Sequence, residues 1–322
     1  EPVPLDGGEM ATIGASLGVA LTEARGAAEF EQLLRQADAA LYRAKAEGRG
    51  TFRFHTKGMD ALRRARARTE AELRRAIAAG EIEPHYQPLV DLGSGRIEGF
   101  EVLARWQHPR RGLLLPGEFI AVAEDAGLIG PLTEAVLRRA AAEAVRWETS
   151  LPIAVNLSAL LLHDAGLAGR VLGILAEAGL PPERLEVEVT ETAVATDPER
   201  ARRVAGALQA AGVRLAMDDF GTGYSSLANL RALPFDRIKI DRSFIAGLGD
   251  GDDAEGEEIV TAIVALGRSL GLPTVAEGIE NAATAHRARA LGCHVGQGWY
   301  FGRPVPATEV PTLLTIAAWP ME

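Results

Sequence analysis

The feature that most constrains this chain is a repeated alternation of short apolar strands with long helices rich in alanine and leucine, which begins near Glu83. The predicted strands are EPHYQPLVDL, IEGFEVLARW, PIAVNLS, RLEVEVTE, VRLAMDDF, RIKID, PTVAEGIE and HVGQGWYF. Strands that alternate with helices at this spacing form parallel βαβ units. So many units in one domain favour an α/β fold of the (β/α)₈ TIM-like barrel type, with a doubly wound sheet as the alternative.

One pair of predicted strands differs from the others. The stretches YQPLVDL and RIEGFEVL are separated by a short turn that contains Gly93 and Gly95. A turn this short joins antiparallel strands, so we expect a hairpin here. The predicted barrel therefore contains one antiparallel strand.

The N-terminal part of the chain is too small to bury a core of its own. TIGASLGVAL indicates a strand, and AEFEQLLRQADAALYRAKAEGRG indicates an amphipathic helix with apolar residues at helical spacing. GMDALRRARARTEAELRRAIAAGEI indicates a second helix, whose many arginines favour a solvated connector. We therefore expect a small α/β fragment at 1–56, a linker helix at 57–72 and the main domain at 73–322. Because the first residue is Glu1, we expect a piece of a longer protein.

Composition narrows the classes of function. The formal charge of −10 argues against binding of a nucleic-acid polymer, although it allows a small anionic ligand held by a metal. The single cysteine, Cys293, excludes a disulfide framework and a cysteine-rich zinc site, and favours a cytoplasmic location. No run of about eighteen apolar residues occurs, so we expect no direct membrane contact here. A missing N-terminal region could still tether the full-length protein to a membrane.

Polar side chains recur near the end of the predicted strands. In EVEVT, Val187 and Val189 face one side of the strand and Glu188 faces the other, and AVNLS, RIKID and FEVLARW show the same alternation. In a parallel barrel the late inward positions surround one mouth, where barrel enzymes carry their active sites. The convergent set is Glu101, Asn156, Glu188, Asp218, Asp219, Lys239, Glu277 and Gln297.

This set consists mainly of carboxylate and amide oxygen donors, which suit Mg²⁺, Mn²⁺ or Ca²⁺ rather than zinc. Asp218 and Asp219 are adjacent in an apolar run, where two carboxylates repel each other. Two divalent ions would offset that repulsion, so we predict a two-metal site. Each residue alone could instead be a helix cap or a partner in a structural ion pair. Their recurrence at separate strand ends argues against a purely structural origin for the set.

From about Leu73 to the C-terminus, the chain resembles the EAL domain of bacterial cyclic-di-GMP phosphodiesterases. The stretches that carry the resemblance are HYQPLVDL, GFEVLARW, AVNLS, VEVTET, AMDDFGTGYSSL, LPFDRIKIDRSFI, TVAEGIE and GQGWYFGRP, in family order. The signature Glu-Ala-Leu is Glu101-Val102-Leu103 in this chain. The GRP that contains Arg303 replaces the more common Ser-Lys-Pro.

The N-terminal part resembles the end of a GGDEF, or diguanylate cyclase, domain. The resemblance is carried by ASLGVAL and ADAALYRAKAEGRGTFRF. The sequence DGGE at Asp6 to Glu9 is similar to the cyclase signature, but it lies too close to the SLGV strand. We interpret DGGE as a turn. We therefore expect this remnant to lack the cyclase site.

The EAL resemblance implies a role for each matching residue. The implied metal ligands are Glu101, Asn156, Glu188 and Asp218 for a first ion and Asp218 with Asp219 for a second. The implied catalytic residues are Lys239, Glu277, Glu101 and Asp218. The implied substrate-binding residues are Gln87, Arg105, Gln297, Asp241 and Pro304. The loop DFGTGYSSL and its anchor involve Glu191, Asp219, Phe220 and Gly221.

The resemblance implies a phosphodiesterase that uses Mg²⁺ or Mn²⁺ to hydrolyse cyclic-di-GMP to linear pGpG. It also implies inhibition by Ca²⁺ and a homodimer formed through the EAL domain. The alternative is a non-catalytic cyclic-di-GMP receptor, but such receptors usually lose a metal ligand or the DDFG loop, and this sequence retains both. A metal-dependent barrel enzyme of the aldolase or enolase type would fit the carboxylates alone but not the quoted motifs.

Overall fold

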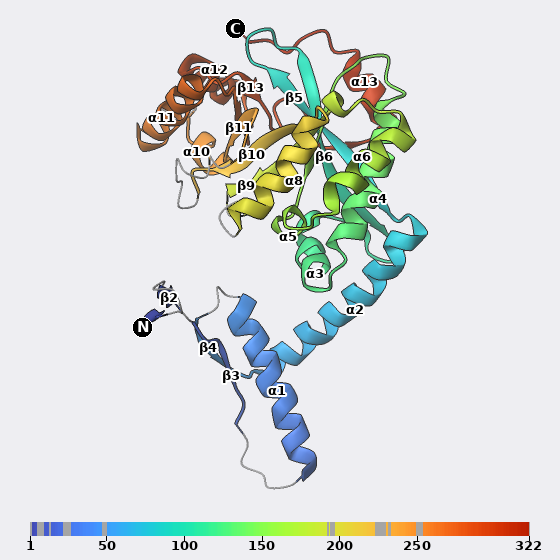
Figure 1. The fold of residues 1–322 in the computed structure, drawn as a ribbon, viewed down its shortest axis with the longest axis vertical. Helices are drawn as coiled ribbons and strands as arrows, with labels where there is room; N and C mark the ends of the chain where they lie inside the picture. The colour runs from blue at the N-terminus through green and yellow to red at the C-terminus, as the bar shows by residue number, and fades with distance from the viewer. Residues whose placement is uncertain are drawn as a thin grey trace. The chain divides into compact units, whose positions relative to one another are not determined.

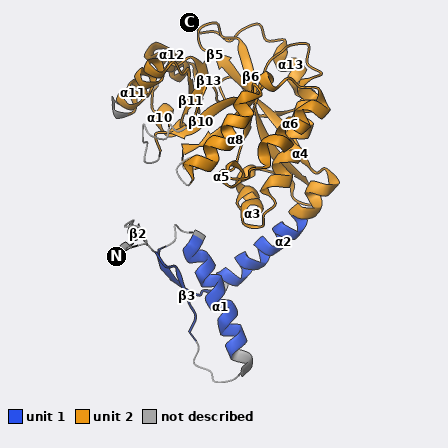
Figure 2. Cartoon of the chain, viewed as in Figure 1, with its two compact units in different colours: residues 1–72 blue, residues 73–322 orange. Residues whose placement is uncertain are grey.

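The structure is a computed structural model that describes residues 2–4, 10–12, 14–21, 27–46, 50–191, 193, 197–222, 230, 233–248 and 254–321. The chain divides into two compact units, residues 1–72 and residues 73–322 (Figure 2). Across these described ranges, no helix combines the length and apolar character needed to cross a membrane.

The described residues of unit 1 form two small strand pairs and two helices. Its elements are β1 (Pro2–Pro4), β2 (Met10–Thr12), β3 (Leu17–Val19), α1 (Ala27–Ala46), β4 (Phe52–Phe54) and the first part of α2 (Lys57–Ala79). The strands β1 and β2 pair antiparallel, whereas β3 and β4 pair parallel. Of the predicted strand TIGASLGVAL, Thr12 ends β2 and Leu17–Val19 form the short β3. The DGGE stretch at Asp6 to Glu9 lies outside the described residues.

The sheet and helix of unit 1 approach closely at a glycine. A Cβ atom at Gly18 of β3 would lie 1.9 Å from the carbonyl oxygen of Ala37 in α1. Only glycine permits this approach, because any side chain would collide with the helix backbone.

Unit 2 contains a closed eight-stranded barrel. In pairing order its strands are β5 (Ile82–Asp91), β13 (Val295–Gly296), β12 (Thr274–Ala276), β11 (Arg237–Ile240), β10 (Arg214–Phe220), β9 (Leu185–Thr190), β8 (Ile153–Asn156) and β6 (Ile97–His108). The strand β5 pairs antiparallel with both β13 and β6, which closes the barrel, and the other barrel pairings are parallel. The predicted barrel with one antiparallel strand is therefore confirmed.

Helices cover the outside of the barrel, and Figure 1 shows α4, α6, α8, α11 and α12 arranged around the strands. The helices are η1 (Pro116–Glu118), α3 (Ile120–Asp125), α4 (Ile129–Ala144), α5 (Ala159–Leu162), α6 (Leu167–Ala178), η2 (Pro182–Arg184), α8 (Pro198–Ala210), α10 (Arg242–Ile245), α11 (Ala254–Leu270), α12 (Ala282–Leu291), η3 (Ala307–Glu309) and α13 (Val310–Leu314). Two short strands, β7 (Gly112–Leu114) and β14 (Val305–Pro306), extend the sheet beside β6 and β5.

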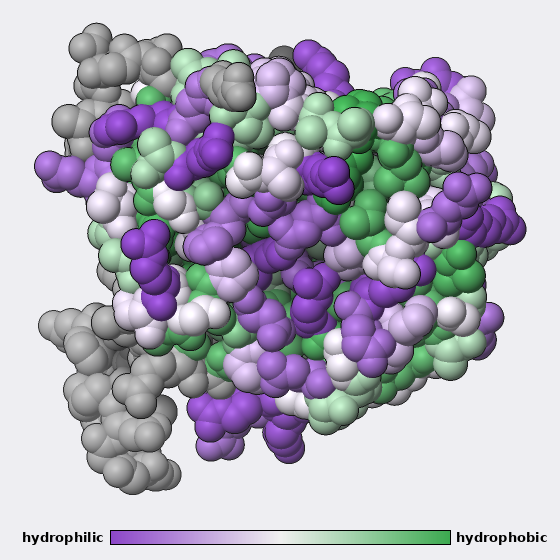
Figure 3. All heavy atoms as spheres, turned by 90° about the horizontal axis from the view of Figure 1, so that it is seen from above, coloured by the Kyte–Doolittle hydropathy of each residue, from purple (hydrophilic) through white to green (hydrophobic). Residues whose placement is uncertain are grey.

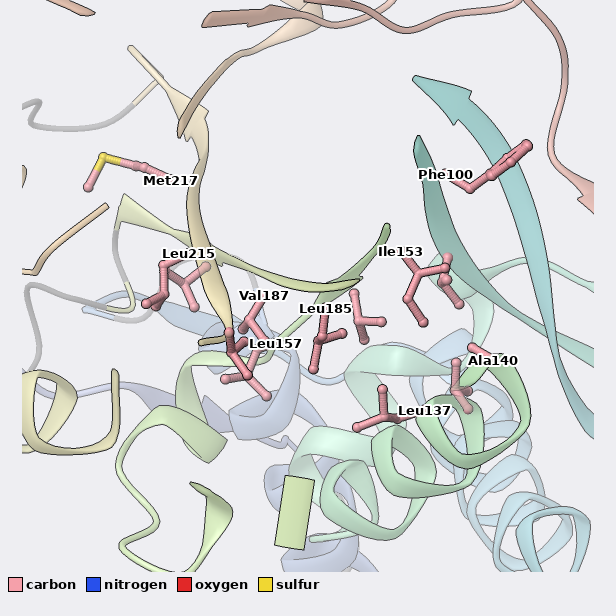
Figure 4. Close-up of a cluster of buried hydrophobic side chains, with 14 of the residues drawn as sticks. Phe100, Leu137, Ala140, Ile153, Leu157, Leu185, Val187, Leu215 and Met217 are labelled. Carbon is pink, nitrogen blue, oxygen red and sulfur yellow. The ribbon is translucent and has the colours of Figure 1, made fainter. Parts of the chain in front are cut away.

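The main core lies between the outer faces of the strands and the helices. Figure 4 shows Leu137 and Ala140 of α4 next to Ile153 of β8 and Leu185 of β9, and all four are buried. Burying a large aliphatic side chain of this kind contributes about 1.5–3 kcal/mol relative to leaving it exposed. On the surface, by contrast, hydrophilic side chains gather across the middle of the face seen in Figure 3.

A second, smaller apolar cluster fills the barrel interior. It consists of Leu89, Ala154, Val275 and Val295, which come from β5, β8, β12 and β13. These side chains point inward because they alternate along their strands with the outward core residues. The barrel is therefore packed beneath the polar residues at its mouth, as in other barrels of this type.

Candidate active site

The polar residues predicted at the strand ends converge at one mouth of the barrel. A cavity of about 260 Å³ opens there. Among the predicted residues, its lining includes Gln87, Glu101, Asp218, Lys239, Glu277 and Gln297. These residues belong to or directly follow β5, β6, β10, β11, β12 and β13. The barrel thus brings together side chains that are far apart in the sequence.

Lys239 lies among the carboxylates of this mouth. Its Nζ atom is 2.6 Å from Oε1 of Glu277 and 2.8 Å from Oε2 of Glu188. It is 3.3 Å from Oδ1 of Asp218 and 3.8 Å from Oε2 of Glu101. Burial alone would lower the pKa of Lys239, but the surrounding carboxylates outweigh burial and raise this pKa well above its usual value. Lys239 is therefore a buried cation.

One ammonium group does not offset all of the negative charge around it. Burial raises the pKa of Glu188 well above its usual value, and it raises the pKa of Glu277 to about 8, in each case against the opposing effect of Lys239. Burial, followed by the neighbouring Asp218, also raises the pKa of Asp219. A divalent cation at the mouth would reverse these shifts by stabilising the ionised carboxylates.

The donor atoms of the mouth fit such a cation. Within the described part of the chain, both carboxylate oxygens of Glu188 and Oδ1 of Asp218 are buried without a hydrogen-bond partner. Lys239 forms ion pairs with two of these atoms, Oε2 of Glu188 and Oδ1 of Asp218. Asp218, Asp219 and Glu277 each offer a carboxylate oxygen within 4.8 Å of the others. Clustered carboxylate oxygens of this kind suit Mg²⁺ or Mn²⁺.

Side-chain amides hold the carboxylate of Glu101 from two sides. Nδ2 of Asn156 donates a hydrogen bond to Oε1 of Glu101 at 2.5 Å, and Nε2 of Gln297 donates to Oε2. Nε2 of Gln297 also donates to Oε1 of Gln87 at 3.1 Å, and Nε2 of Gln87 in turn donates to the carbonyl oxygen of Gly302. This network fixes the orientation of Glu101 within β6.

The backbone at the end of β10 explains how two adjacent aspartates reach one site. In a regular strand, Asp218 and Asp219 would point to opposite faces. The pairing of β10 with β11 shifts register between Met217 and Phe220, and Asp219 has a φ of 53°. Among the described residues, it is the one non-glycine residue with positive φ. This left-handed conformation turns the second carboxylate toward the first, and such backbone strain is common at functional sites.

Three of the predicted substrate-binding residues are not in the cavity lining. Arg105 is buried, and its Nη1 donates to the carbonyl of Ala104 at 2.9 Å. The carboxylate of Asp241 caps α10, where it accepts a hydrogen bond from the backbone N–H of Ser243 at 2.9 Å. Pro304 is half-buried near the C-terminus.

The predicted loop is described only in part. Glu191 directly follows β9 and is buried, as is Phe220 at the end of β10. Gly221 has a φ of 101°, and a Cβ atom there would lie 2.8 Å from the ring of Phe244. The rest of the loop, at 223–229, lies outside the described residues, and so do the predicted contacts of Glu191 with it.

The cavity also contains residues that the sequence analysis missed. Arg242, Glu280 and Trp299 line it, and the guanidinium carbon of Arg303 lies 4.2 Å from the ring centroid of Trp299. Trp299 is 56% exposed, which is unusual for so large an aromatic residue. Glu280 and Trp299 lie within the motifs TVAEGIE and GQGWYF, so their proximity in sequence to Glu277 and Gln297 was an available signal.

The fold and the site together define a barrel protein with an acidic mouth, whose clustered oxygen donors suit a divalent cation. Comparison with known families makes this more specific: the chain belongs to the EAL domain family, whose profile matches residues 70–304. The profile of the diguanylate cyclase, GGDEF domain matches residues 2–51. The predicted resemblance to both families is confirmed, and the GGDEF match precedes the EAL match along the chain.

Two relatives of Pseudomonas aeruginosa whose names state an activity are similar to this chain. The chain is 42% identical over 303 residues to the bifunctional diguanylate cyclase/cyclic di-GMP phosphodiesterase MucR of Pseudomonas aeruginosa, covering 92% of this chain and 44% of MucR. It is 39% identical over 318 residues to the cyclic di-GMP phosphodiesterase NbdA of the same organism, covering 98% of this chain and 40% of NbdA. The chain thus spans less than half the length of these relatives.

Two solved structures are also similar. The PaMucR phosphodiesterase in complex with c-di-GMP superposes with a TM-score of 0.72 at 42% identity, covering 76% of this chain and 99% of that chain. BlrP1 of Klebsiella pneumoniae, in a complex with calcium and cyclic di-GMP, gives a TM-score of 0.62 at 32% identity, covering 70% of this chain and 56% of that chain.

Proposed function

We propose that the domain at 73–322 is a metal-dependent phosphodiesterase that hydrolyses cyclic-di-GMP to linear pGpG. The observation that carries this proposal is the ammonium group of Lys239, buried among four carboxylates at the mouth of the barrel. The substrate is supported by the relatives, because MucR and NbdA are named as cyclic di-GMP phosphodiesterases and PaMucR was solved with c-di-GMP.

The proposed cofactor is Mg²⁺ or Mn²⁺ in a two-metal site. The first ion would be held by Glu101, Asn156, Glu188 and Asp218, and the second by Asp218 and Asp219. When bound, the ions would lower the pKa of water and offset the charge that develops on the phosphoryl oxygens. Ca²⁺ accepts the same oxygen donors but is a weaker Lewis acid, so we propose that it supports substrate binding without turnover. The calcium complex of BlrP1 with cyclic di-GMP is in line with this.

Side chains that line the cavity have the other proposed roles in the reaction. Lys239 supplies a fixed positive charge for a phosphoryl oxygen, a role that needs little reorganisation because the group is already held in place. Glu277 lines the cavity, and its carboxylate, ionised once metal is bound, would accept a proton from the attacking water, as a general base does. Gln87 and Gln297 line the cavity and would orient water and substrate.

Other roles rest on the family resemblance. Substrate contacts are proposed on this ground for Arg105, Asp241 and Pro304. We also propose that Glu191 anchors the loop that begins at Asp219, and that the domain forms a homodimer. The role of Glu191 can be tested by measuring the rate against Mg²⁺ concentration for Glu191→Gln and for the wild type. Sedimentation of the same two proteins tests the homodimer.

The decisive experiment incubates the chain with cyclic-di-GMP in Mg²⁺ or Mn²⁺ and separates the products by chromatography. Formation of pGpG that stops in EDTA and in Glu101→Ala is the expected result, because Glu101 is a proposed metal ligand. Binding of cyclic-di-GMP without turnover in either metal would favour the alternative, a non-catalytic receptor. A chain that neither binds nor hydrolyses cyclic-di-GMP would overturn the proposal.

A further inference from the structure

A second charged cluster lies inside the barrel, below the mouth. We call it the floor cluster; it consists of Glu98, Glu186, Arg214 and Arg237. Arg237 donates a hydrogen bond from Nη2 to Oε1 of Glu98, and its Nη1 lies 3.7 Å from Oε1 of Glu186. Nε of Arg214 lies 3.9 Å from Oε2 of Glu186. The side chains of Arg237 and Glu186 are only 8% and 3% exposed, whereas those of Glu98 and Arg214 are 35% and 34% exposed. The cluster therefore has a buried central pair, Arg237 and Glu186, and two partly exposed outer members.

Each member of the floor cluster shares a strand with a residue of the mouth. Glu186 precedes Glu188 by two positions on β9, and Arg237 precedes Lys239 by two positions on β11. Glu98 precedes Glu101 on β6, and Arg214 precedes Asp218 on β10. Two residues along a strand correspond to about 6.6 Å, so Glu186 and Arg237 lie one layer below the site. Glu98 and Arg214 lie further from it, because they precede Glu101 and Asp218 by more than two positions.

Arg237 links strands that are not neighbours in the sheet. Between β11 and β6, the barrel contains β10, β9 and β8. Arg237 therefore reaches across the interior to Glu98, 139 positions away in the sequence, while it also faces Glu186. An arginine can contact two carboxylates at once because its planar guanidinium carries five donors in a fixed geometry.

We propose that Arg237 is a positioning residue, which holds β6, β9 and β11 at the spacing that places Glu101, Glu188 and Lys239 around the metal site. This inference rests on the proposed function for the metal but not for the substrate. Groups that orient metal ligands from outside the first coordination sphere typically change metal affinity by about 10–100-fold when they are removed.

The test uses two variants, both of which keep the net charge of the chain. Arg237→Lys keeps the positive charge but replaces the planar guanidinium and its five donors with a single ammonium nitrogen on a shorter side chain. The double variant Glu186→Gln with Arg237→Gln removes one charge of each sign, so the net charge is unchanged and no new uncompensated carboxylate is left at position 186. The matched control is Glu257→Gln with Arg287→Gln, which removes an ion pair between α11 and α12 on the outer surface.

The first readout is Mn²⁺ affinity in the absence of substrate, measured by calorimetry on the whole chain. We expect the Mn²⁺ dissociation constant to rise about 10-fold or more in both Arg237 variants and to stay at the wild-type value in the control. The second readout is turnover at saturating Mn²⁺, for which we expect kcat to fall more than KM changes. The melting temperature in EDTA shows whether each variant folds, and if the double variant does not, Arg237→Lys still carries the comparison.

The outcomes separate this inference from the proposed function. Wild-type Mn²⁺ affinity in a folded Arg237 variant would overturn the positioning role, and so would an equal loss in the surface control. If the wild-type chain binds Mn²⁺ but does not hydrolyse cyclic-di-GMP, only the proposed reaction fails, and the affinity comparison stands. If the wild-type chain binds no Mn²⁺, both proposals fail.

Discussion

The ammonium nitrogen of Lys239 lies 2.6 Å from a carboxylate oxygen of Glu277, and the lysine side chain is 1% exposed. This pair joins β11 to the end of β12 at the centre of the mouth. A buried ion pair is strongly destabilised when one partner is removed, because the remaining charge stays in a poorly solvated position. The same pair therefore links catalysis to the stability of the metal-free domain.

Lys239→Met should lower turnover about 100-fold or more at saturating Mg²⁺, because a fixed positive charge for the phosphoryl oxygens is lost. It should also lower the melting temperature in EDTA, since the carboxylates lose the cation between them. Mg²⁺ should then raise the melting temperature more in this variant than in the wild type. Turnover within a fewfold of the wild type would contradict the role of Lys239.

Metal should stabilise the fold, because a ligand that binds only the native state raises the free energy of unfolding by mass action. We expect millimolar Mg²⁺ or Mn²⁺ to raise the melting temperature of the wild type. Most of this increase should be absent in Asp218→Asn, which lacks the carboxylate proposed to bridge two ions. A melting curve that stays the same across a wide metal titration would count against the site.

The metal-free protein should become less stable as the pH rises from about 5 to about 8. The pKa of Glu277 is raised from 4.5 in the unfolded chain to about 8 in the folded protein. Between these pKa values the native state binds a proton that the unfolded state does not. The contribution of Glu277 to the free energy of unfolding is therefore fully present below pH 4.5 and is lost as the pH rises through about 8. Urea denaturation in EDTA across this range measures the slope, which should be smaller in Glu277→Gln.

Saturating Mg²⁺ should remove or reverse that slope, because a metal ion competes with the proton for the carboxylates. The apparent affinity for Mg²⁺ should accordingly increase with pH up to about 8. Proton release on Mg²⁺ binding can be measured by calorimetry in two buffers with different ionisation enthalpies. Metal binding without any proton release near pH 7 would show that Glu277 is already ionised.

Gly221→Ala should destabilise the domain more than Gly127→Ala. Both glycines have positive φ, at 101° and 66°, so alanine is strained at either position, by roughly 1–2 kcal/mol. At Gly221 the added Cβ would also lie 2.8 Å from the ring of Phe244, whereas at Gly127 nothing lies within 4 Å. The difference in the free energy of unfolding, measured in urea, isolates the contact with Phe244. Equal effects of the two substitutions would show that the ring moves freely.

Cys293 should not react with thiol reagents in the native protein. It is buried, and burial raises the pKa of its thiol to about 12, so the reactive thiolate is scarce at neutral pH. We expect modification by a disulfide reagent only after denaturation, with one thiol released per chain. Rapid modification of the native protein would show that this part of the barrel opens readily.

The sequence by itself determined the strands, their order and most of the mouth. The alternation of Val187 and Val189 with Glu188 is a local pattern, because neighbouring side chains on any strand face opposite sides. The turn at Gly93 and Gly95 likewise identified the antiparallel hairpin from adjacent residues. Such local patterns can be recognised from neighbouring residues alone. The folding of the barrel then brings the ends of the strands together.

Only the tertiary structure decided features that depend on distant residues or on backbone distortion. The positive φ of Asp219 and the register shift of β10 against β11 turn two adjacent carboxylates to one site, and alternation alone would have separated them. The contact of Arg237 with Glu98 joins strands 139 positions apart, so no window of sequence contains it. Sequence patterns report which face a side chain takes, whereas the closure of the barrel determines what that side chain meets.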